Sequence, residues 1–499
     1  MTSAELYTAY KTKMQKIADV KYASAVLQWD QETYLPPKGN DFRGRQIATL
    51  SEIAHQQFTD QKTGDLLNAL TERDDLNLLE KRNVERSLED YTRNKKLTSD
   101  FVRKMSETVN RSYHAWAKAG TENCFATFQQ PLDELIQLKK QEADMLGYEQ
   151  HPYNALMDEY DKGLTVATVD KIFSDLKPQL LDLLGFIKNK PQVDDSFLRQ
   201  YFKREDQWNF GMEILKRMGF DFEAGRQDIS LHPFTTNFNN SDVRVTTRVD
   251  THDFGNMTWS CIHEGGHALY EQGLPGEQYG LPLGEYCSLS IHESQSRVWE
   301  NCIGRGLPFW QHNFPLLQSL FPKQTEGLTI NNFYRSINKV APSLIRTEAD
   351  ELTYHFHVMI RYEIEKMLIE GTIATKDIPA FWNEHYQQYL GVTVPDDKRG
   401  CLQDIHWSHG SFGYFATYSL GSMYAAQMYA AIEKKNPSIG EEISIGNNTG
   451  ILNWLKENIY RHGRYFSSGG LCRQATGEEL QSTYFINYAT EKYTQIYSG

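Results

Sequence analysis

Apolar residues spaced three and four apart restrict the fold of this chain more than any other feature. They recur from residue 3 to about residue 189, with charged residues around them. Examples are Leu66, Leu67 and Leu70, and later Leu132, Leu135 and Ile136. This spacing places side chains on one face of an α-helix, and that face must be buried against another element. We therefore expect residues 1–225 to form a mainly helical half.

A break in this pattern falls at residues 29–37, which end in Pro36 and Pro37. Proline lacks the backbone N–H that a helix interior needs, and its ring clashes with the preceding turn. The first helix is therefore predicted to end here in a tight turn.

A second change of pattern falls at residues 229–250. Residues 243–249 largely alternate and are rich in β-branched side chains, which predicts a strand. Mostly helical segments follow, including residues 350–371 and 414–436, with a Gly- and Asn-rich loop at residues 440–450. The expected fold class is mainly α with one small β-sheet. We expect a single unit, with a central region at 226–430 that holds the sheet and the active-site helices, and C-terminal helices at 431–499.

The composition argues against several classes of partner. The 52 Lys and Arg residues face 65 Asp and Glu, a formal net charge of -13, and no basic block stands out, so nucleic acid is not an expected partner. No stretch approaches the roughly 18 apolar residues of a membrane-spanning helix, so no membrane partner is expected. The N-terminal residues lack the apolar core of a secretory signal, so we expect a cytoplasmic protein. Its six cysteines form no CxxC pair and are expected to be buried, reduced thiols.

The segment His263-Glu264-Gly265-Gly266-His267 carries the strongest chemical signal. Residues four apart lie on one helix face, so His263 and His267 can present imidazole nitrogens to one metal ion, with Glu264 alongside. Two surface histidines on a helix are the alternative. A helix selected only for stability would avoid the two glycines, because each costs roughly 1 kcal/mol relative to alanine. We therefore expect another segment to approach closely there.

A third ligand is expected downstream, because a catalytic zinc takes three protein ligands and keeps an open position for water. Glu293 would complete a site of two imidazoles and one carboxylate, while His292 is an alternative ligand. A hydrogen-bonded or solvated His-Glu pair is the alternative without a metal. Such a site would lower the pKa of bound water from about 15.7 toward about 7, and Glu264 would then act as the general base.

Six separate strings occur in an order that matches a known family. They are His232-Pro233-Phe234, Asp242-Val243-Arg244-Val245-Thr246, the helix from His263 to His267, His292-Glu293-Ser294-Gln295, Ile345-Arg346-Thr347-Glu348-Ala349-Asp350 and Gly400-Cys401-Leu402-Gln403-Asp404-Ile405-His406-Trp407. With these strings the chain resembles the carboxypeptidase Taq family of zinc metallocarboxypeptidases. Residues 29–37 and 484–488 also look like the family, so the resemblance spans nearly the whole chain.

This resemblance implies a large helical fold with a deep groove, similar to angiotensin-converting enzyme and neurolysin, in which the small sheet forms one groove wall. It implies an enzyme that removes single residues from the C-termini of peptides with broad specificity. The family's metal ligands carry over to His263, His267 and Glu293, and its general base carries over to Glu264. One Zn²⁺ per chain, replaceable by Co²⁺, and a homodimer are also implied.

Recognition of a free terminal carboxylate suits a guanidinium, which donates two parallel hydrogen bonds. Arg346 and Arg244 are the candidates, and structural ion pairs with Asp350 and Asp242 are the alternative. Gln403 and His232 are further candidates for binding substrate.

His406 is a candidate catalytic residue that would bind a substrate carbonyl, with Asp404 holding an imidazole tautomer. Tyr414 is favoured over Tyr418 as the oxyanion donor, by similarity to related zinc peptidases, while a core tyrosine is the alternative. Arg297 stands where thermolysin-type enzymes have an aspartate that orients a zinc imidazole. Glu300 or Asp350 is therefore expected to take that part.

The leading prediction is a cytoplasmic zinc metallocarboxypeptidase acting on peptides with a free C-terminus. An oligoendopeptidase or a dipeptidyl carboxypeptidase on the same scaffold is the alternative within the chemistry. A helical binding scaffold that retains its metal without turnover is the alternative outside it.

Overall fold

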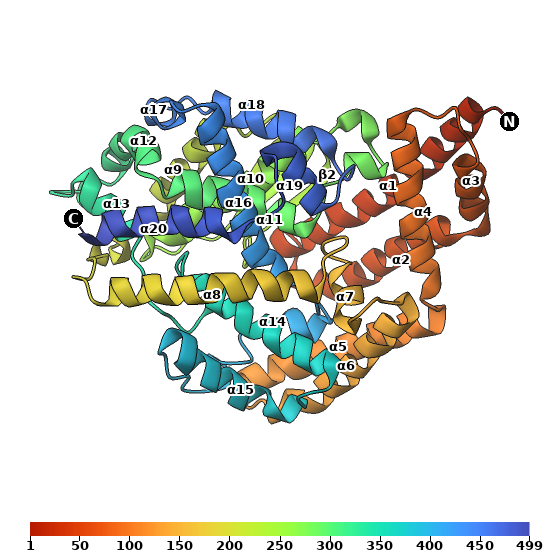
Figure 1. Ribbon diagram of the computed structural model, residues 1–499, viewed down its shortest axis with the longest axis horizontal. Helices are drawn as coiled ribbons and strands as arrows, with labels where there is room; N and C mark the ends of the chain where they lie inside the picture. The colour runs from red at the N-terminus through yellow and green to blue at the C-terminus, as the bar shows by residue number, and fades with distance from the viewer. Residues whose placement is uncertain (499) are drawn as a thin grey trace. The chain divides into compact units, whose positions relative to one another are not determined.

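The computed structural model describes residues 1–498 and is mainly α-helical (Figure 1). The expected fold class is confirmed, because helices make up most of these residues and three strands form one small sheet. The chain divides into two compact units, each assembled from three separate segments. Unit 1 comprises Met1–Lys95, Asp194–Ile337 and Tyr424–Leu480, and unit 2 comprises Lys96–Val193, Asn338–Met423 and Gln481–Gly499. The boundaries of these two units differ from those of the three regions expected from the sequence, which were 1–225, 226–430 and 431–499.

Unit 1 holds the sheet and most of the helices. These helices are α1 (Ser3–Thr33), α2 (Asn40–Thr59), α3 (Gln61–Thr71), α4 (Leu78–Lys96), α9 (Arg204–Met218), α10 (Phe254–Gly273), α11 (Leu289–Arg297), α12 (Leu307–Leu320), α13 (Ile330–Ile337), α17 (Ile439–Ser444), α18 (Thr449–Asn458) and α19 (Ser468–Thr476). A π-helical segment, Val298–Gly304, directly follows α11.

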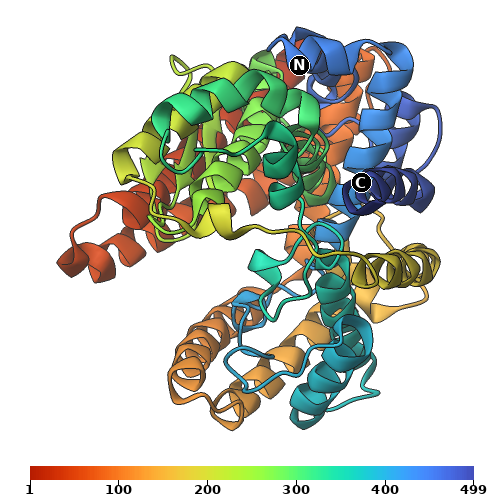
Figure 2. The same ribbon diagram turned by 90° about the vertical axis from the view of Figure 1, so that its left-hand side faces the viewer.

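Unit 2 is helical. Its helices are α5 (Ser99–Glu122), α6 (Ala126–Leu146), α7 (Pro152–Met157), α8 (Val166–Lys188), α14 (Tyr354–Glu370), α15 (Ile378–His385) and α20 (Ser482–Ser498). Helices α5 and α6 pack side by side, as Figure 2 shows in orange. Helix α16 (Ala416–Lys435) begins in unit 2 and ends in unit 1.

The first helix ends where the prolines predict. Thr2 caps its N-terminus in a capping box with Glu5, and the helix runs to Thr33. Pro36 and Pro37 lie beyond this end, at the start of a short 3₁₀ turn.

The sheet has the order β1-β3-β2, with β1 (Gly225–Ile229) parallel and β2 (Thr235–Asn239) antiparallel to the central strand β3 (Asp242–Thr247). The strand expected at residues 243–249 is therefore present and ends at Thr247. Val243 and Val245 are buried, as expected for alternate residues of a strand with one covered face. Helix α10 packs against β2 and β3, so the sheet lies beside the helix that carries the two histidines.

Two local expectations are wrong. Residues 440–450 are not all loop, because Ile439 and Ile443 are four apart and both buried, and α17 forms around them. Cys124 is exposed, whereas the other five cysteines are buried and all six are free thiols. Within residues 1–498, the helices include none with the length and apolar character needed to cross a bilayer.

Candidate metal centre

Helix α10 is fixed at its N-terminus by a cap and by aromatic packing. The Asp253 carboxylate accepts a hydrogen bond from the Gly255 N–H at 2.9 Å. Phe254, the first residue of the helix, is fully buried, and its ring centroid lies 5.3 Å from that of Phe202 and 5.6 Å from that of Phe210. These contacts anchor the start of the helix that presents His263 and His267.

The two glycines of α10 allow the close approach that the sequence predicts. A Cβ on Gly266 would lie 2.7 Å from the Gln295 carbonyl oxygen and 2.7 Å from the Ser296 Cα, both in the backbone of α11. A Cβ on Gly265 would meet the Leu215 side chain at 2.6 Å. Helix α11 therefore runs against α10 at the level of the histidines, and this contact brings Glu293 to them.

The three expected ligands converge. The Glu293 Oε2 atom lies 3.8 Å from the His263 Nε2 atom and 3.7 Å from the His267 Nε2 atom. One ligand atom from each residue lies within 4.8 Å of the others. Two imidazole nitrogens and one carboxylate oxygen form a donor set that suits zinc and other transition metals. These three residues therefore fit a bound metal ion.

Buried charges around the triad hold His263 and Glu293 in place. The His263 Nδ1 atom lies 2.8 Å from the Glu300 Oε2 atom. Arg297 donates from Nε to Glu293 Oε1 at 2.7 Å and from Nη1 to Glu300 Oε2 at 3.0 Å. Burial alone would raise the pKa of Glu300, but Arg297 and His263 hold it well below its usual range. Glu300 is therefore a carboxylate that orients His263, as one of the two expectations has it.

Asp350, the other residue expected to orient a metal-binding imidazole, caps a turn instead. Its carboxylate accepts from the backbone N–H groups of Ala341, Leu352 and Thr353, each at 3.0 Å. Burial raises its pKa.

The nitrogens of His292 contact other atoms than the three that converge from His263, His267 and Glu293. Its Nδ1 atom lies 2.6 Å from the His267 Nδ1 atom, and its Nε2 atom lies 2.7 Å from the Glu271 Oε1 atom. The geometry therefore favours Glu293 over His292 as the third ligand.

Glu264 follows the first ligand and is held by the sheet. Thr235, at the start of β2, donates a hydrogen bond to the Glu264 Oε2 atom at 2.7 Å. Glu264 is 8% exposed, and burial raises its pKa. A carboxylate with a raised pKa, beside three side chains that fit a metal ion, suits a general base.

A second cluster of predicted residues lies in unit 2. Arg346 donates from Nε and Nη2 to Asp404 Oδ1 at 3.0 and 2.8 Å. Arg361 donates from Nε to Asp404 Oδ2 at 2.6 Å. Burial opposes the charge of Asp404, but the two guanidinium groups hold its pKa well below the usual range. The ion-pair partner of Arg346 is thus Asp404 and not Asp350.

Asp404 does not hold the tautomer of His406. The His406 Nδ1 atom lies 3.9 Å from Asp404 Oδ1 and makes no hydrogen bond within residues 1–498, while its Nε2 atom lies 3.2 Å from the Tyr418 hydroxyl. Burial lowers the pKa of His406 to about 3, so this imidazole is neutral near pH 7. The Tyr414 ring is close by, with its centroid 5.3 Å from that of His406.

Gln403 is engaged within unit 2. Its side-chain oxygen accepts from the Arg346 N–H at 2.9 Å, and its nitrogen donates to the Leu344 carbonyl at 3.0 Å.

Comparison with known proteins identifies the family. Residues 9–493 match the family model of the carboxypeptidase Taq (M32) metallopeptidases. The chain belongs to this family. It is 38% identical over 488 residues to carboxypeptidase 1 of Bacillus subtilis, covering 97% of each chain. It is 36% identical over 490 residues to thermostable carboxypeptidase 1 of Pyrococcus furiosus, covering 96% of this chain and 97% of that one.

Solved structures agree with this assignment. The structure of CHT has a TM-score of 0.97 and 56% identity, covering 98% of this chain and 99% of that chain. The M32 carboxypeptidase from Deinococcus radiodurans R1 has a TM-score of 0.97 and 37% identity, covering 99% of this chain and 100% of that chain. The protein is therefore a metallocarboxypeptidase, and a metal cofactor follows from its family.

In this metallocarboxypeptidase, Arg244 lies on the sheet that also holds Thr235. It donates from Nε and Nη2 to the Asp242 carboxylate at 2.9 and 3.0 Å. Its guanidinium carbon lies 4.3 Å from the Trp29 ring centroid and 4.8 Å from the Phe238 ring centroid. Arg244 thus makes the structural ion pair that was the alternative to its predicted binding role, and its guanidinium lies against two aromatic rings.

His232 is exposed, and its backbone carbonyl accepts a hydrogen bond from the Ser230 hydroxyl at 2.6 Å. No contact described for its side chain assigns it to a binding site.

Sequence reasoning missed Thr235 and Glu271, which contact the candidate site residues Glu264 and His292 of the metallocarboxypeptidase. Thr235 lies in a strand that pairs with β3, and no motif marks it. Glu271 lies four residues after His267, so the helical spacing that pairs the two histidines also indicates it.

Proposed function

We propose that this protein is a zinc-dependent carboxypeptidase that removes single residues from the C-termini of peptides with broad specificity. The observation that carries the proposal is the convergence of two imidazole Nε2 atoms and one carboxylate oxygen beside a buried glutamate. A broad range of side chains suits a site whose chemistry addresses the peptide bond and the terminal carboxylate. Co²⁺ is proposed as a functional replacement, because it accepts the same nitrogen and oxygen ligands.

In the proposed mechanism, the residues around the metal have separate roles in hydrolysis. His263, His267 and Glu293 would hold a zinc ion, which would act as a Lewis acid toward water and the peptide carbonyl. Glu264 takes the proton of the attacking water and hands it to the leaving amine. The Thr235 hydroxyl holds the Glu264 carboxylate in one orientation throughout.

Glu264→Gln is the direct test of this mechanism. The variant should bind zinc as the unaltered protein does, because Glu264 is not one of the three converging residues. Its turnover should fall by about 10²- to 10⁴-fold, since the amide cannot accept the proton. Glu277→Gln, an exposed substitution in the same unit, is the control. A fully active Glu264→Gln variant would exclude Glu264 as the base.

Blocked peptides test the direction of attack. The unaltered protein, incubated with one peptide as its free acid and as its C-terminal amide, should shorten only the acid, one residue at a time, in mass spectra. Chelation should stop the reaction. Equal cleavage of both forms would favour an oligoendopeptidase, loss of dipeptides would favour a dipeptidyl carboxypeptidase, and no cleavage with metal bound would favour a binding scaffold.

We further propose Arg244 as the receptor of the terminal carboxylate, with Arg346 as the alternative. The proposal is supported by side-chain exposure, because Arg244 is 17% exposed whereas Arg346 is 6% exposed. Both arginines make an ion pair, Arg244 with Asp242 and Arg346 with Asp404, but Arg346 also donates to the Tyr354 hydroxyl. Arg244→Gln should raise KM for free-acid peptides by about 10- to 100-fold, from loss of charged hydrogen bonds. An unchanged KM would favour Arg346 as the residue that binds the terminal carboxylate, and Arg346→Gln would then be the variant to measure.

The remaining roles are also proposals. Tyr414 is proposed as the oxyanion donor, and His406, Gln403 and His232 as substrate-binding groups. Tyr414→Phe should lower kcat more than it raises KM, since an oxyanion donor acts mainly in the transition state. A homodimer in the cytoplasm is proposed from the family resemblance, and light scattering of the purified protein measures the oligomeric state.

A further inference from the structure

We infer that His292 is a positioning residue that sets the tautomer of the metal ligand His267 and connects it to the carboxylate of Glu271. The inference rests on the metal site proposed above and not on the peptide-hydrolysing activity. The four residues involved come from three elements of unit 1: His267 and Glu271 from α10, His292 from α11 and Asn237 from β2.

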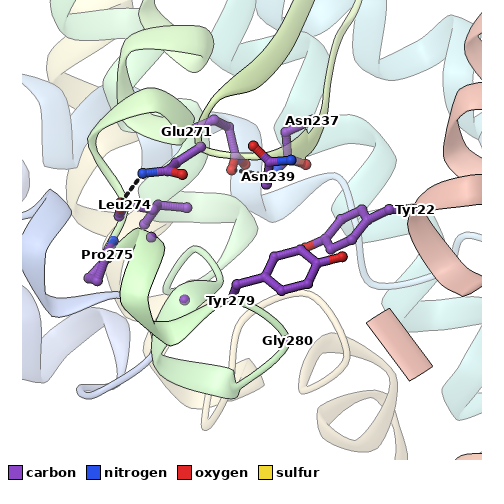
Figure 3. Close-up of a pocket in the computed structure, with 11 residues that line it drawn as sticks. Tyr22, Asn237, Asn239, Glu271, Leu274, Pro275, Tyr279 and Gly280 are labelled. Carbon is purple, nitrogen blue, oxygen red and sulfur yellow. Dashed lines mark hydrogen bonds between the residues drawn. The ribbon is translucent and has the colours of Figure 1, made fainter. Parts of the chain in front are cut away.

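The side chains of these residues form one continuous chain of hydrogen bonds. The Nδ1 atoms of His267 and His292 are 2.6 Å apart. His292 Nε2 is 2.7 Å from Glu271 Oε1, and the Asn237 amide donates to Glu271 Oε2 at 2.6 Å. Figure 3 shows the Glu271 carboxylate next to Asn237 at the edge of a small pocket. Both oxygens of this carboxylate are therefore engaged.

Metal binding selects one direction for the protons along this chain. The His267 Nε2 atom faces Glu293, so it must be unprotonated to bind a cation, and its proton then sits on Nδ1. That N–H would donate to the His292 Nδ1 atom, which leaves the His292 proton on Nε2 to donate to the Glu271 Oε1 atom. In the reverse direction a protonated Glu271 would donate to His292, and His267 would carry its proton on Nε2. The reverse direction therefore prevents metal binding.

Packing keeps His292 in the orientation that this chain requires. Its ring centroid lies 4.8 Å from that of Tyr286, nearly perpendicular to it, and 5.5 Å from that of Tyr270. Glu271 is 3% exposed, so its charge is only weakly screened by solvent.

The two histidine ligands are thus held in different ways. His263 meets a carboxylate directly, at 2.8 Å from Glu300. His267 reaches the Glu271 carboxylate through the His292 ring. Helix α11 supplies both the ligand Glu293 and, one residue earlier, the group that orients His267.

Zinc affinity of the purified full-length protein tests this inference. The variants are His292→Phe, which keeps a ring but removes both nitrogens, and His292→Gln, whose amide offers one acceptor and one donor. The dissociation constant for Zn²⁺, measured by competition with a chromophoric chelator, should be 10- to 100-fold larger in His292→Phe. His292→Gln should recover most of that loss. His55→Phe, an exposed substitution on α2, is the control and should match the unaltered protein.

Two further measurements separate positioning from a purely structural role. The thermal midpoint of the metal-free protein reports folding. If His292 is a positioning residue, its replacement should leave this midpoint nearly unchanged while zinc affinity falls. The visible absorption of the Co²⁺-loaded protein reports ligand geometry, and it should change in His292→Phe and return toward the unaltered spectrum in His292→Gln.

Equal zinc affinity in His292→Phe and the unaltered protein would overturn the inference, and so would His292→Gln binding as weakly as His292→Phe. Should His292→Phe fail to fold, Glu271→Gln carries the test, because it keeps the volume and removes the charge. Its zinc affinity should fall by roughly threefold to tenfold, which is no more than the smallest effect usual for the partner of a metal ligand. An unchanged zinc affinity would overturn the inference. Absence of zinc binding in the unaltered protein would instead refute the proposed metal site itself.

Discussion

At the scale of single residues, the metal centre depends on neighbours that direct each functional atom. Arg297 binds one oxygen of Glu293 and leaves the other facing the two histidines. The sequence indicated Glu300 or Asp350 as an orienting carboxylate, and Glu300 lies beside His263. The hydrogen bond of Thr235 to Glu264 could not be inferred from the sequence, because it arises from the packing of β2 on α10.

Thr235→Val should impair catalysis by releasing the Glu264 carboxylate. A lost hydrogen bond to a charged group costs about 1.5–3 kcal/mol, which corresponds to roughly a 10- to 100-fold fall in kcat/KM. Thr235→Ser keeps the hydroxyl and should retain most activity. Steady-state hydrolysis of one free-acid peptide by both variants provides the measurement. Equal rates for Thr235→Val and the unaltered protein would show that Glu264 needs no such support.

At the scale of elements, the contact between α10 and α11 builds the site. The sequence indicated a close approach at Gly265 and Gly266 but could not identify the partner, because many segments were equally available. In the structure, the backbone of α11 crosses at Gly266, and flexible side chains of α9 fill the space at Gly265.

Gly266→Ala should separate these two helices. Its Cβ would lie 2.7 Å from backbone atoms that cannot move alone, so overpacking should cost about 1–3 kcal/mol of stability and weaken zinc binding. Gly265→Ala is the matched control, because its Cβ meets the end of the Leu215 side chain and alanine favours the helix by about 1 kcal/mol. Thermal melts and zinc titrations of both variants measure the difference. Similar effects at the two positions would contradict this account.

Loop 406–414 is anchored to α14 by a buried carboxyl group. Glu365 accepts hydrogen bonds from Trp407 Nε1 at 2.9 Å and from the Gly413 N–H at 2.8 Å, and it also contacts the Tyr153 hydroxyl. Burial raises the pKa of Glu365 to about 7. The loop that carries His406 is thus held by a group that titrates near neutral pH.

The stability of unit 2 should therefore fall as the pH rises toward 8. With a folded pKa above the unfolded one, the Glu365 contribution is complete below about pH 4.5 and is lost as the pH rises through 7. The lost free energy is about 3 kcal/mol. Thermal melts between pH 5 and 8 should show a steeper decline for the unaltered protein than for Glu365→Gln. Parallel curves would indicate that Glu365 is not the titrating group.

At the scale of the whole molecule, a bound metal should stabilise the folded chain. The three ligands come from two helices and converge only in the folded state, so zinc at a thousandfold excess over its Kd adds about 4 kcal/mol. Chelation should lower the thermal midpoint, and Zn²⁺ or Co²⁺ should restore it. Ca²⁺, which prefers oxygen ligands, should not. Identical midpoints with and without chelator would argue against metal binding by the triad.

The division of the chain into two units could not be predicted from its order. Each unit combines three segments that are far apart in the sequence, and α16 contributes to both. Local patterns report which segments are helical, but they carry no information on which distant helices pack together.

The sequence by itself determined the helical fold class, the end of the first helix, the family and the helix that bears the two histidines. These features follow from local spacing and from motifs, which depend on residues near one another in the chain. The tertiary structure decided which groups surround the ligands. Arg346 pairs with Asp404 rather than Asp350. His292 contacts Glu271 and the Nδ1 atom of His267 rather than joining the three converging ligand atoms. Packing between distant segments decides these partners, and local spacing along the chain does not encode it.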